Sequence, residues 1–166
     1  MYSIGDRVMY GIHGVCEITD MEQRCVDRRR IMYFVLEPLD QTGARFLVPS
    51  ENEAALRKLR RIMSREELDA MLSSDAVRED AWIADENQRK QHYRELITSG
   101  DRLSLLRMVR TLHQHKQHQA AAGRKFHLCD DNFLRDAEKL LSAEFSLILG
   151  IQPEQVGEYI LSALEK

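Results

Sequence analysis

The chain has 166 residues, a formal net charge of −3, a hydrophobic fraction of 43% and a charged fraction of 31%. These values are typical of a globular protein with polar helices, and they exclude a strongly basic protein that coats nucleic acid. Because no run of about 18 apolar residues is present, we expect no membrane-spanning segment, no signal peptide and a cytoplasmic location.

Residues 1–60 show the two-residue periodicity of β-strands. Val8 and Tyr10 point to one face of a first strand, and Gly11 and Gly14 bracket a corner that needs positive φ angles. Further strands are expected over residues 15–18, 21–26, 31–38 and 44–49, with polar turns at 27–30 and 40–43. This pattern predicts a small five-stranded β-barrel, Tudor-like or SH3-like, that is filled by its own side chains.

Residues 61–166 instead show the three-to-four-residue periodicity of amphipathic helices. Their expected start signals are a capping box at Ser64 and Glu67, a helix from about Val77 to Thr98, a cap at Asp101, caps at Asp130 and Asp131, and Pro153 in a first helical turn. The predicted fold class is therefore α+β in two domains, a β-barrel over residues 1–60 and an all-α helical bundle over residues 61–166.

The opening segment, Ile4-Gly5-Asp6 followed by Gly11-Ile12-His13-Gly14, resembles the start of the CarD/CdnL family of bacterial RNA polymerase-binding transcription regulators. That N-terminal module is similar to the polymerase-interaction domain of the transcription-repair coupling factor. The resemblance continues through Trp82-Ile83, Ser99-Gly100-Asp101, residues 105–112 and residues 138–145 in family order. It implies a regulator that docks on the RNA polymerase β subunit through its barrel and contacts upstream promoter DNA through its helices, modulating the stability of the open complex.

The resemblance also implies a polymerase-binding surface on the barrel, formed by Arg24, Arg45, Phe46 and Leu47. Many family members carry a basic residue where this chain has Leu47, so Arg24 and Arg45 are the nearest candidates to replace that charge. The strand edges of a small barrel expose N–H and C=O groups that can pair with a strand of a partner.

Basic residues are concentrated in one part of the helical region. Residues 89–125 carry nine Lys/Arg against two Asp/Glu, whereas residues 61–88 and 126–166 each carry three against eight. The candidate DNA-binding side chains within this basic block are Arg89, Lys90, Arg94, Arg107 and Arg110. Their pattern alone fits either an electrostatic footprint for DNA or a solvated face that pairs with the acidic helices. The resemblance favours weak, largely sequence-independent contact with promoter DNA.

Trp82 is a further DNA-binding candidate. The family uses a tryptophan as a wedge at the upstream edge of the melted promoter, but its usual position is Glu86 in this chain, and Trp82 lies one helical turn earlier. Two alternatives are open. Trp82 is either an exposed wedge beside the basic residues of the same helix, or a core residue against Leu68, Met71 or Leu72.

No pattern in the chain indicates catalysis. His113, His115 and His118 lack metal-ligand spacing, and neither a glycine-rich phosphate loop nor a hydrolase elbow is present. Cys16, Cys25 and Cys129 are odd in number, without Cys-x-x-Cys spacing, and are expected to be reduced packing residues. We therefore predict no enzyme activity, cofactor, metal or small-molecule substrate. The alternative functions are an RNA polymerase-docking adaptor whose helical domain binds another protein and not DNA, or a freestanding nucleic-acid binder.

Overall fold

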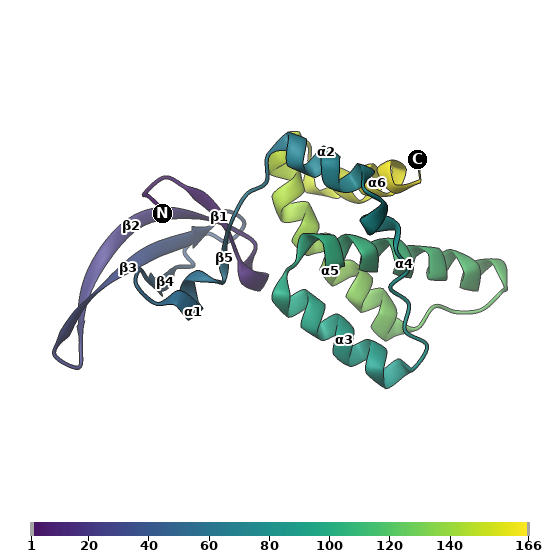
Figure 1. Ribbon diagram of the computed structural model, residues 1–166, viewed down its shortest axis with the longest axis horizontal. Helices are drawn as coiled ribbons and strands as arrows, with labels where there is room; N and C mark the ends of the chain where they lie inside the picture. The colour runs from purple at the N-terminus through teal and green to yellow at the C-terminus, as the bar shows by residue number, and fades with distance from the viewer. Residues whose placement is uncertain (1, 166) are drawn as a thin grey trace. The chain divides into compact units, whose positions relative to one another are not determined.

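The computed structural model describes residues 2–165, and the chain divides into two units between Ile62 and Met63 (Figure 1). The first unit contains β1 (Arg7–Tyr10), the 3-10 turn η1 (Gly11–His13), β2 (Val15–Val26), β3 (Arg29–Pro38), β4 (Phe46–Pro49), the short helix α1 (Glu53–Leu56) and β5 (Leu59–Arg61). The second unit contains α2 (Arg65–Ser73), the 3-10 turn η2 (Asp75–Arg78), α3 (Glu86–Ser99), α4 (Arg102–Ala121), α5 (Leu128–Leu149) and α6 (Pro153–Leu164). No helix within residues 2–165 is long and apolar enough to cross a lipid bilayer.

Across the described part of the first unit, the strands form a five-stranded antiparallel sheet in the order β4-β3-β2-β1-β5. The core of this unit consists of Val8, Cys16, Ile18, Phe34, Leu36, Val48 and Leu59. The sheet is strongly curved, because the ring centroids of Tyr10 on β1 and Phe46 on β4 lie 5.4 Å apart although β2 and β3 separate these strands. In this strand order β4 and β5 are the two edges of the sheet and are not paired with each other. Closure of the sheet into a barrel therefore stays a prediction.

Two features of the sheet differ from the sequence-based expectation. The strands expected over residues 15–18 and 21–26 are one strand, β2, with an irregular register between Ile18 and Asp20. β5 was not expected, because a strand of 3 residues is too short to display a periodicity of its own. It forms through its antiparallel pairing with β1, and it contributes Leu59 to the core.

Three local signals of the helical unit act as predicted. Ser64 and Glu67 form a capping box at the start of α2. The side chain of Asp101 accepts a hydrogen bond from the Ser104 N–H at 3.0 Å and caps α4, and Pro153 occupies the first turn of α6. Each signal depends on residues within one helical turn, so the sequence alone contains it.

The other two predicted helix starts are wrong. α3 begins at Glu86 rather than near Val77, because the side chain of Asp85 accepts from the Gln88 N–H at 2.9 Å and caps the helix there. α5 begins at Leu128, so Asp130 lies inside the first turn and is not its cap. Trp82 consequently lies in an irregular segment before α3 and not on a helix.

A buried ion pair fixes the beginning of the helical unit. Glu144 of α5 accepts hydrogen bonds from the Arg102 guanidinium at 2.6 Å and from the Met63 N–H at 3.0 Å. Because an unpaired buried carboxylate is costly, these donors are needed at a side chain that is almost fully buried. The contacts tie the first residue of the second unit to α4 and α5.

Candidate interaction surfaces

The strand register places two candidate polymerase-binding residues on the same face of the first sheet. Arg24 lies opposite Ile31 in the β2–β3 pair, and Leu47 lies opposite Val35 in the β3–β4 pair. Opposed residues of antiparallel strands share a face, and residues two apart along a strand also share one. We call this face the outer face; the residues that the register assigns to it include Glu22, Arg24, Val26, Arg29, Ile31, Tyr33 and Leu47.

Glu22 connects Arg24 and Arg45 on the outer face. Its two carboxylate oxygens accept hydrogen bonds from Arg45 at 2.8 Å and from Arg24 at 3.2 Å. The Arg45 hydrogen bond, followed by that of Arg24, lowers the pKa of the Glu22 carboxyl. The side chain of Arg45 is 49% exposed and that of Arg24 is 55% exposed. Ion pairs at such exposure contribute little to stability, so both guanidinium groups can exchange Glu22 for a carboxylate of a partner.

Phe46 lies on the opposite face from Arg24 and Leu47. It pairs with Leu36 of the core, and its ring centroid is 4.3 Å from that of His13 and 5.4 Å from that of Tyr10. The Phe46 ring is half-buried against the core of the first unit. The structure therefore does not bring Phe46 to the outer face with the other three candidates.

Arg89 is not on an exposed basic side of α3, and that expectation is wrong. The Arg89 side chain is 3% exposed and donates two hydrogen bonds to the Asp130 carboxylate, at 2.9 and 3.1 Å. A third hydrogen bond joins its guanidinium to the Ile83 carbonyl at 3.0 Å. Tyr93, one turn along α3, is also buried and donates to the Ala81 carbonyl. Arg89 and Tyr93 face the bundle, so Arg89 is unavailable to a DNA phosphate.

The Trp82 side chain is half-buried among α3 and α4 residues. Its ring stacks on that of His115 with centroids 3.7 Å apart and an interplanar angle of 20°, and the Arg89 guanidinium carbon lies 4.3 Å from the ring centroid. Burial lowers the pKa of His115. We call Trp82, Arg89, His115 and Asp130 the tryptophan cluster. The Trp82 side chain is thus neither a fully exposed wedge nor a fully buried core residue.

The four other candidate DNA-binding side chains have different environments. Lys90, which is partly exposed, forms an i,i+4 ion pair with the exposed side chain of Glu86 at 3.1 Å, and Arg94 is exposed. Arg107 instead donates to the Ala76 carbonyl at 2.6 Å, and Arg110 donates to the Arg78 carbonyl at 2.8 Å. Arg107 and Arg110 therefore hold η2 in place, with part of their surface still exposed.

The sequence pattern did not indicate the partners Glu22, Asp130 and His115. Asp130 and Arg89 are 41 positions apart, and no local signal marks such a pair. Cys25 is exposed, so its expected packing role is wrong, whereas Cys16 is buried and burial raises its thiol pKa to about 11. In the part of the chain that the structure describes, no three His, Cys, Asp or Glu side chains are grouped to hold a metal ion.

Comparison with known proteins accounts for both units. The family model of the CarD-like/TRCF RID domain matches residues 2–62, and that of the CarD C-terminal domain matches residues 68–161. No curated protein sequence matched the chain. Since the two models together span nearly all of the sequence, in the order expected from its motifs, the chain belongs to the CarD family.

Proposed function

We propose that this protein is a transcription regulator that docks on the RNA polymerase β subunit through the outer face of its sheet and contacts promoter DNA through its helical unit. The CarD family is a non-enzymatic family of RNA polymerase-interacting transcription regulators. Our proposal adds three points to this family-level description: the polymerase subunit that is bound, the contact with DNA and the effect on the open complex.

The placement of Arg24, Arg45 and Leu47 is the observation that carries the docking proposal. Two half-exposed guanidinium groups flank Glu22 on the outer face, and Leu47 supplies an apolar side chain there. Leu47 also lies on β4, an edge strand, whose free N–H and C=O groups can add a strand of the polymerase to the sheet. Backbone pairing would supply affinity, and the arginines would select an acidic neighbour.

Charge reversal on the outer face tests the docking proposal. Replacing both arginines (Arg24→Glu with Arg45→Glu) is expected to abolish co-purification with RNA polymerase, while the far-UV circular dichroism spectrum stays unchanged. Glu22→Gln is the matched control, because it removes the internal partner and leaves both arginines in place. We expect Glu22→Gln to bind polymerase at least as well as the unaltered chain. Undiminished co-purification of the double variant would remove the arginines from the interface.

For the helical unit, we propose that Lys90 and Arg94 contact phosphates near Trp82. Phosphate contacts position a protein on DNA without specifying its sequence, so binding should be weak and nearly independent of sequence. Trp82 would pack against an unstacked base pair at the edge of the melted promoter and stabilise the open complex. Arg107 and Arg110 supplement this surface with their exposed parts.

One observation favours the adaptor alternative, in which the helical unit binds a protein and not DNA. Three of the five basic side chains expected on the DNA surface, Arg89, Arg107 and Arg110, donate hydrogen bonds within the bundle. A salt titration of promoter binding, with and without RNA polymerase, separates the alternatives. Salt-sensitive DNA binding that weakens in a combined Lys90→Gln and Arg94→Gln variant supports the DNA contact of the helical unit. DNA affinity that this variant leaves unchanged at every salt concentration, with and without polymerase, supports the adaptor.

A further inference from the structure

β2 and β3 continue as a two-stranded ribbon beyond the rest of the sheet. β1 pairs with residues 15–17 of β2, and β4 pairs with residues 33–36 of β3. Among the described residues, positions 23–26 form strand pairs only with positions 29–32, and Figure 1 shows this hairpin reaching past β1 and β4. Every residue from 23 to 30 is exposed. The core of the first unit therefore does not require the end of the ribbon.

The end of the ribbon is basic. Residues 24–31 contain four arginines and one carboxylate, whereas residues 1–60 as a whole contain nine Lys/Arg and nine Asp/Glu. Arg24 is paired with Glu22, but no ion pair or hydrogen bond engages the side chains of Arg28, Arg29 or Arg30 within residues 2–165. We call residues 27–30, which contain these three arginines, the arginine tip. Guanidinium groups bind phosphate oxygens through two parallel hydrogen bonds, which suits them to a phosphate backbone.

The turn of the arginine tip keeps an arginine where glycine is favoured. Asp27 has a φ angle of 51° and Arg28 a φ angle of 65°, so both residues of the two-residue loop are left-handed. Turns of this kind prefer aspartate followed by glycine, because a side chain at the second position is strained. Arg28 therefore places a charge at the extreme of the hairpin at the expense of the turn's stability.

The arginines of the tip lie on both sides of the ribbon. Arg29 is opposite Val26 and belongs to the outer face, whereas Arg30 is opposite Cys25 and belongs to the other face. An acidic protein surface would meet one face of a ribbon and leave the other in solvent. A duplex groove has phosphates along both walls, and the DNA major groove, about 12 Å wide, admits a two-stranded ribbon.

We propose that the arginine tip is a second nucleic-acid contact, which enters a groove of duplex DNA and binds phosphates on both sides of it. This inference goes beyond the proposed function, which assigns the first unit to the polymerase alone. Arg28, Arg29 and Arg30 supply the phosphate contacts. The contact is independent of base sequence, because it involves the backbone of the duplex.

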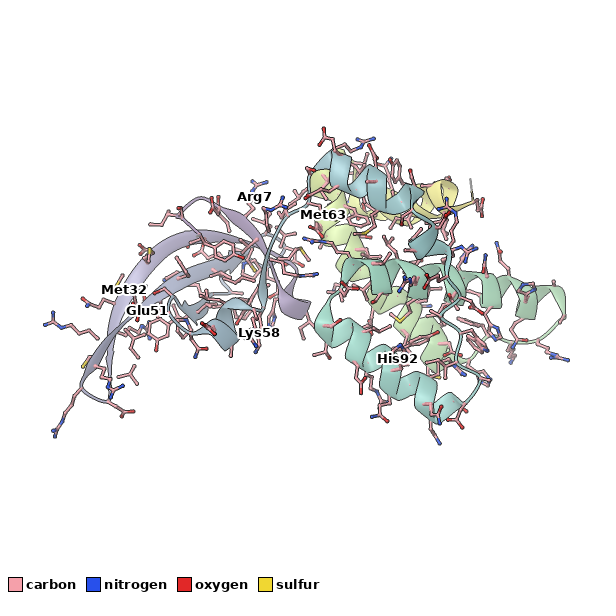
Figure 2. The ribbon with its side chains drawn as sticks, viewed as in Figure 1. Arg7, Met32, Glu51, Lys58, Met63 and His92 are labelled. Atoms are coloured by element: carbon pink, nitrogen blue, oxygen red, sulfur yellow. The ribbon has the colours of Figure 1, made fainter. Side chains whose placement is uncertain are left out.

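The salt dependence of DNA binding by the full chain tests the proposal. Arg28→Gln, Arg29→Gln and Arg30→Gln are combined, and the affinity for a mixed-sequence duplex is measured by fluorescence anisotropy over a salt series. If three phosphate contacts are lost, the slope of log affinity against log salt becomes less steep by about 2.7. The matched control combines Arg7→Gln, Arg57→Gln and Lys58→Gln, which removes the same charge from exposed positions outside the hairpin. In Figure 2, the labelled residues Arg7 and Lys58 lie far from the turn between β2 and β3. We expect the control slope to stay near that of the unaltered chain.

Arg28→Gly separates folding from binding. Glycine relaxes the left-handed turn, so this variant should have a higher Tm than the unaltered chain. It also removes one phosphate contact, so its salt slope should be less steep by about 0.9. A higher Tm with a weaker salt dependence supports the proposal, because damage to the fold would weaken the salt dependence and lower the Tm.

Three results would overturn the proposal. One is a salt slope for the triple-tip variant equal to that of the unaltered chain. A second is an equal change in the matched control, which would assign the effect to net charge. The third is loss of polymerase co-purification by the triple-tip variant at an unchanged DNA slope, which would identify an acidic protein surface as the partner. Failure of the docking proposal would appear instead in the Arg24 and Arg45 double variant, so the two proposals fail in different assays.

Discussion

At the scale of single residues, Asp130 and Asp131 on α5 show how strongly burial changes the energetics of an ion pair. Asp130 is fully buried and binds Arg89 through both oxygens, whereas Asp131 pairs with the exposed side chains of Lys116 and Arg135. Removing one partner of a buried pair leaves an uncompensated charge, but removing an exposed pair does not.

Replacing Asp130 should therefore destabilise the helical unit much more than replacing Asp131. Asp130→Ala is expected to lower the free energy of unfolding by about 3–5 kcal/mol, because Arg89 stays buried without its carboxylate. Asp131→Ala should lower it by less than about 1 kcal/mol. Urea unfolding of the two variants gives the comparison. Equal losses would mean that solvent reaches Arg89 and that the Asp130 pair is not energetically buried.

The fluorescence of Trp82 should report the protonation of His115, because the chain contains one tryptophan and its ring stacks on this imidazole. Burial lowers the pKa of His115 below its ordinary value of 6.5, Arg89, His118 and His127 lower it further, and Asp130 opposes them. The neutral imidazole therefore makes its full contribution to stability at pH values above the pKa that His115 has in the unfolded chain, about 6.5. This contribution is lost as the pH falls through the folded pKa.

We expect a step in Trp82 emission with a midpoint below pH 6.5, the ordinary pKa of the imidazole. Protonation places a second cation beside the Arg89 guanidinium and weakens the stack. His115→Gln should remove the step, and His118→Gln, at an exposed position, should keep it. A step that persists in His115→Gln would assign the titration to another group.

The residues whose environment differs from the sequence-based prediction depend on contacts between distant segments. Arg89 and Lys90 are adjacent and both basic, yet α3 turns Arg89 toward Asp130 and leaves Lys90 at the surface. Helical spacing indicates which residues share a side, but the side that faces the core depends on the helix that packs there. A buried arginine with its own carboxylate cannot be distinguished from a surface arginine by pattern alone.

At the scale of elements, the sequence predicts correctly where a helix begins if a strong local capping signal is present, and it does not if that signal is missing. Ser64 and Asp101 cap their helices with hydrogen bonds that span three residues. The sequence predicts too early a start for α3, because residues between Val77 and Asp85 are compatible with a helix, whereas the helix begins at Glu86. η2 and the segment after it are held instead by long-range contacts, which include the Thr111 hydroxyl accepting from the Ala81 N–H at 3.0 Å.

Arg107 and Arg110 should stabilise η2, because they donate to the Ala76 and Arg78 carbonyls. The combined Arg107→Ala and Arg110→Ala variant is expected to lose about 1–3 kcal/mol of unfolding free energy. Amide hydrogen exchange in residues 75–79 should become faster. Arg94→Ala, at an exposed position, should change stability by less than about 0.5 kcal/mol. Unchanged stability of the double variant, together with weaker DNA binding, would show that these arginines act on DNA alone.

At the scale of the whole molecule, the family assignment was predictable because it rests on the order of motifs along nearly the entire chain. The two family models match the segments on either side of the Ile62–Met63 boundary. It is harder to predict from the sequence which residues of a motif share one face of the sheet, because the outer face depends on the register of β2, β3 and β4. That register places Phe46 on the opposite face from Arg24 and Leu47, which the order of residues does not reveal.

Because each unit has its own hydrophobic core, we predict that the first unit binds RNA polymerase without the helical unit. A fragment of residues 1–62 contains the complete first core, β5 included. It should fold and co-purify with RNA polymerase. A fragment of residues 1–58 lacks β5, so it loses the core side chain of Leu59, the Leu59 carbonyl that accepts from the Tyr2 hydroxyl at 3.2 Å, and the strand paired with β1.

The shorter fragment should therefore be poorly folded by circular dichroism and should fail to capture polymerase, because a small unit has little core to spare. Capture by residues 1–58 as efficient as by residues 1–62 would mean that β5 is dispensable. A folded fragment of residues 1–62 that fails to capture polymerase, when the full chain succeeds, would place part of the docking surface on the helical unit. Success of the longer fragment alone would assign docking to the curved sheet, because the edge strand β5 completes the core on which the outer face is built.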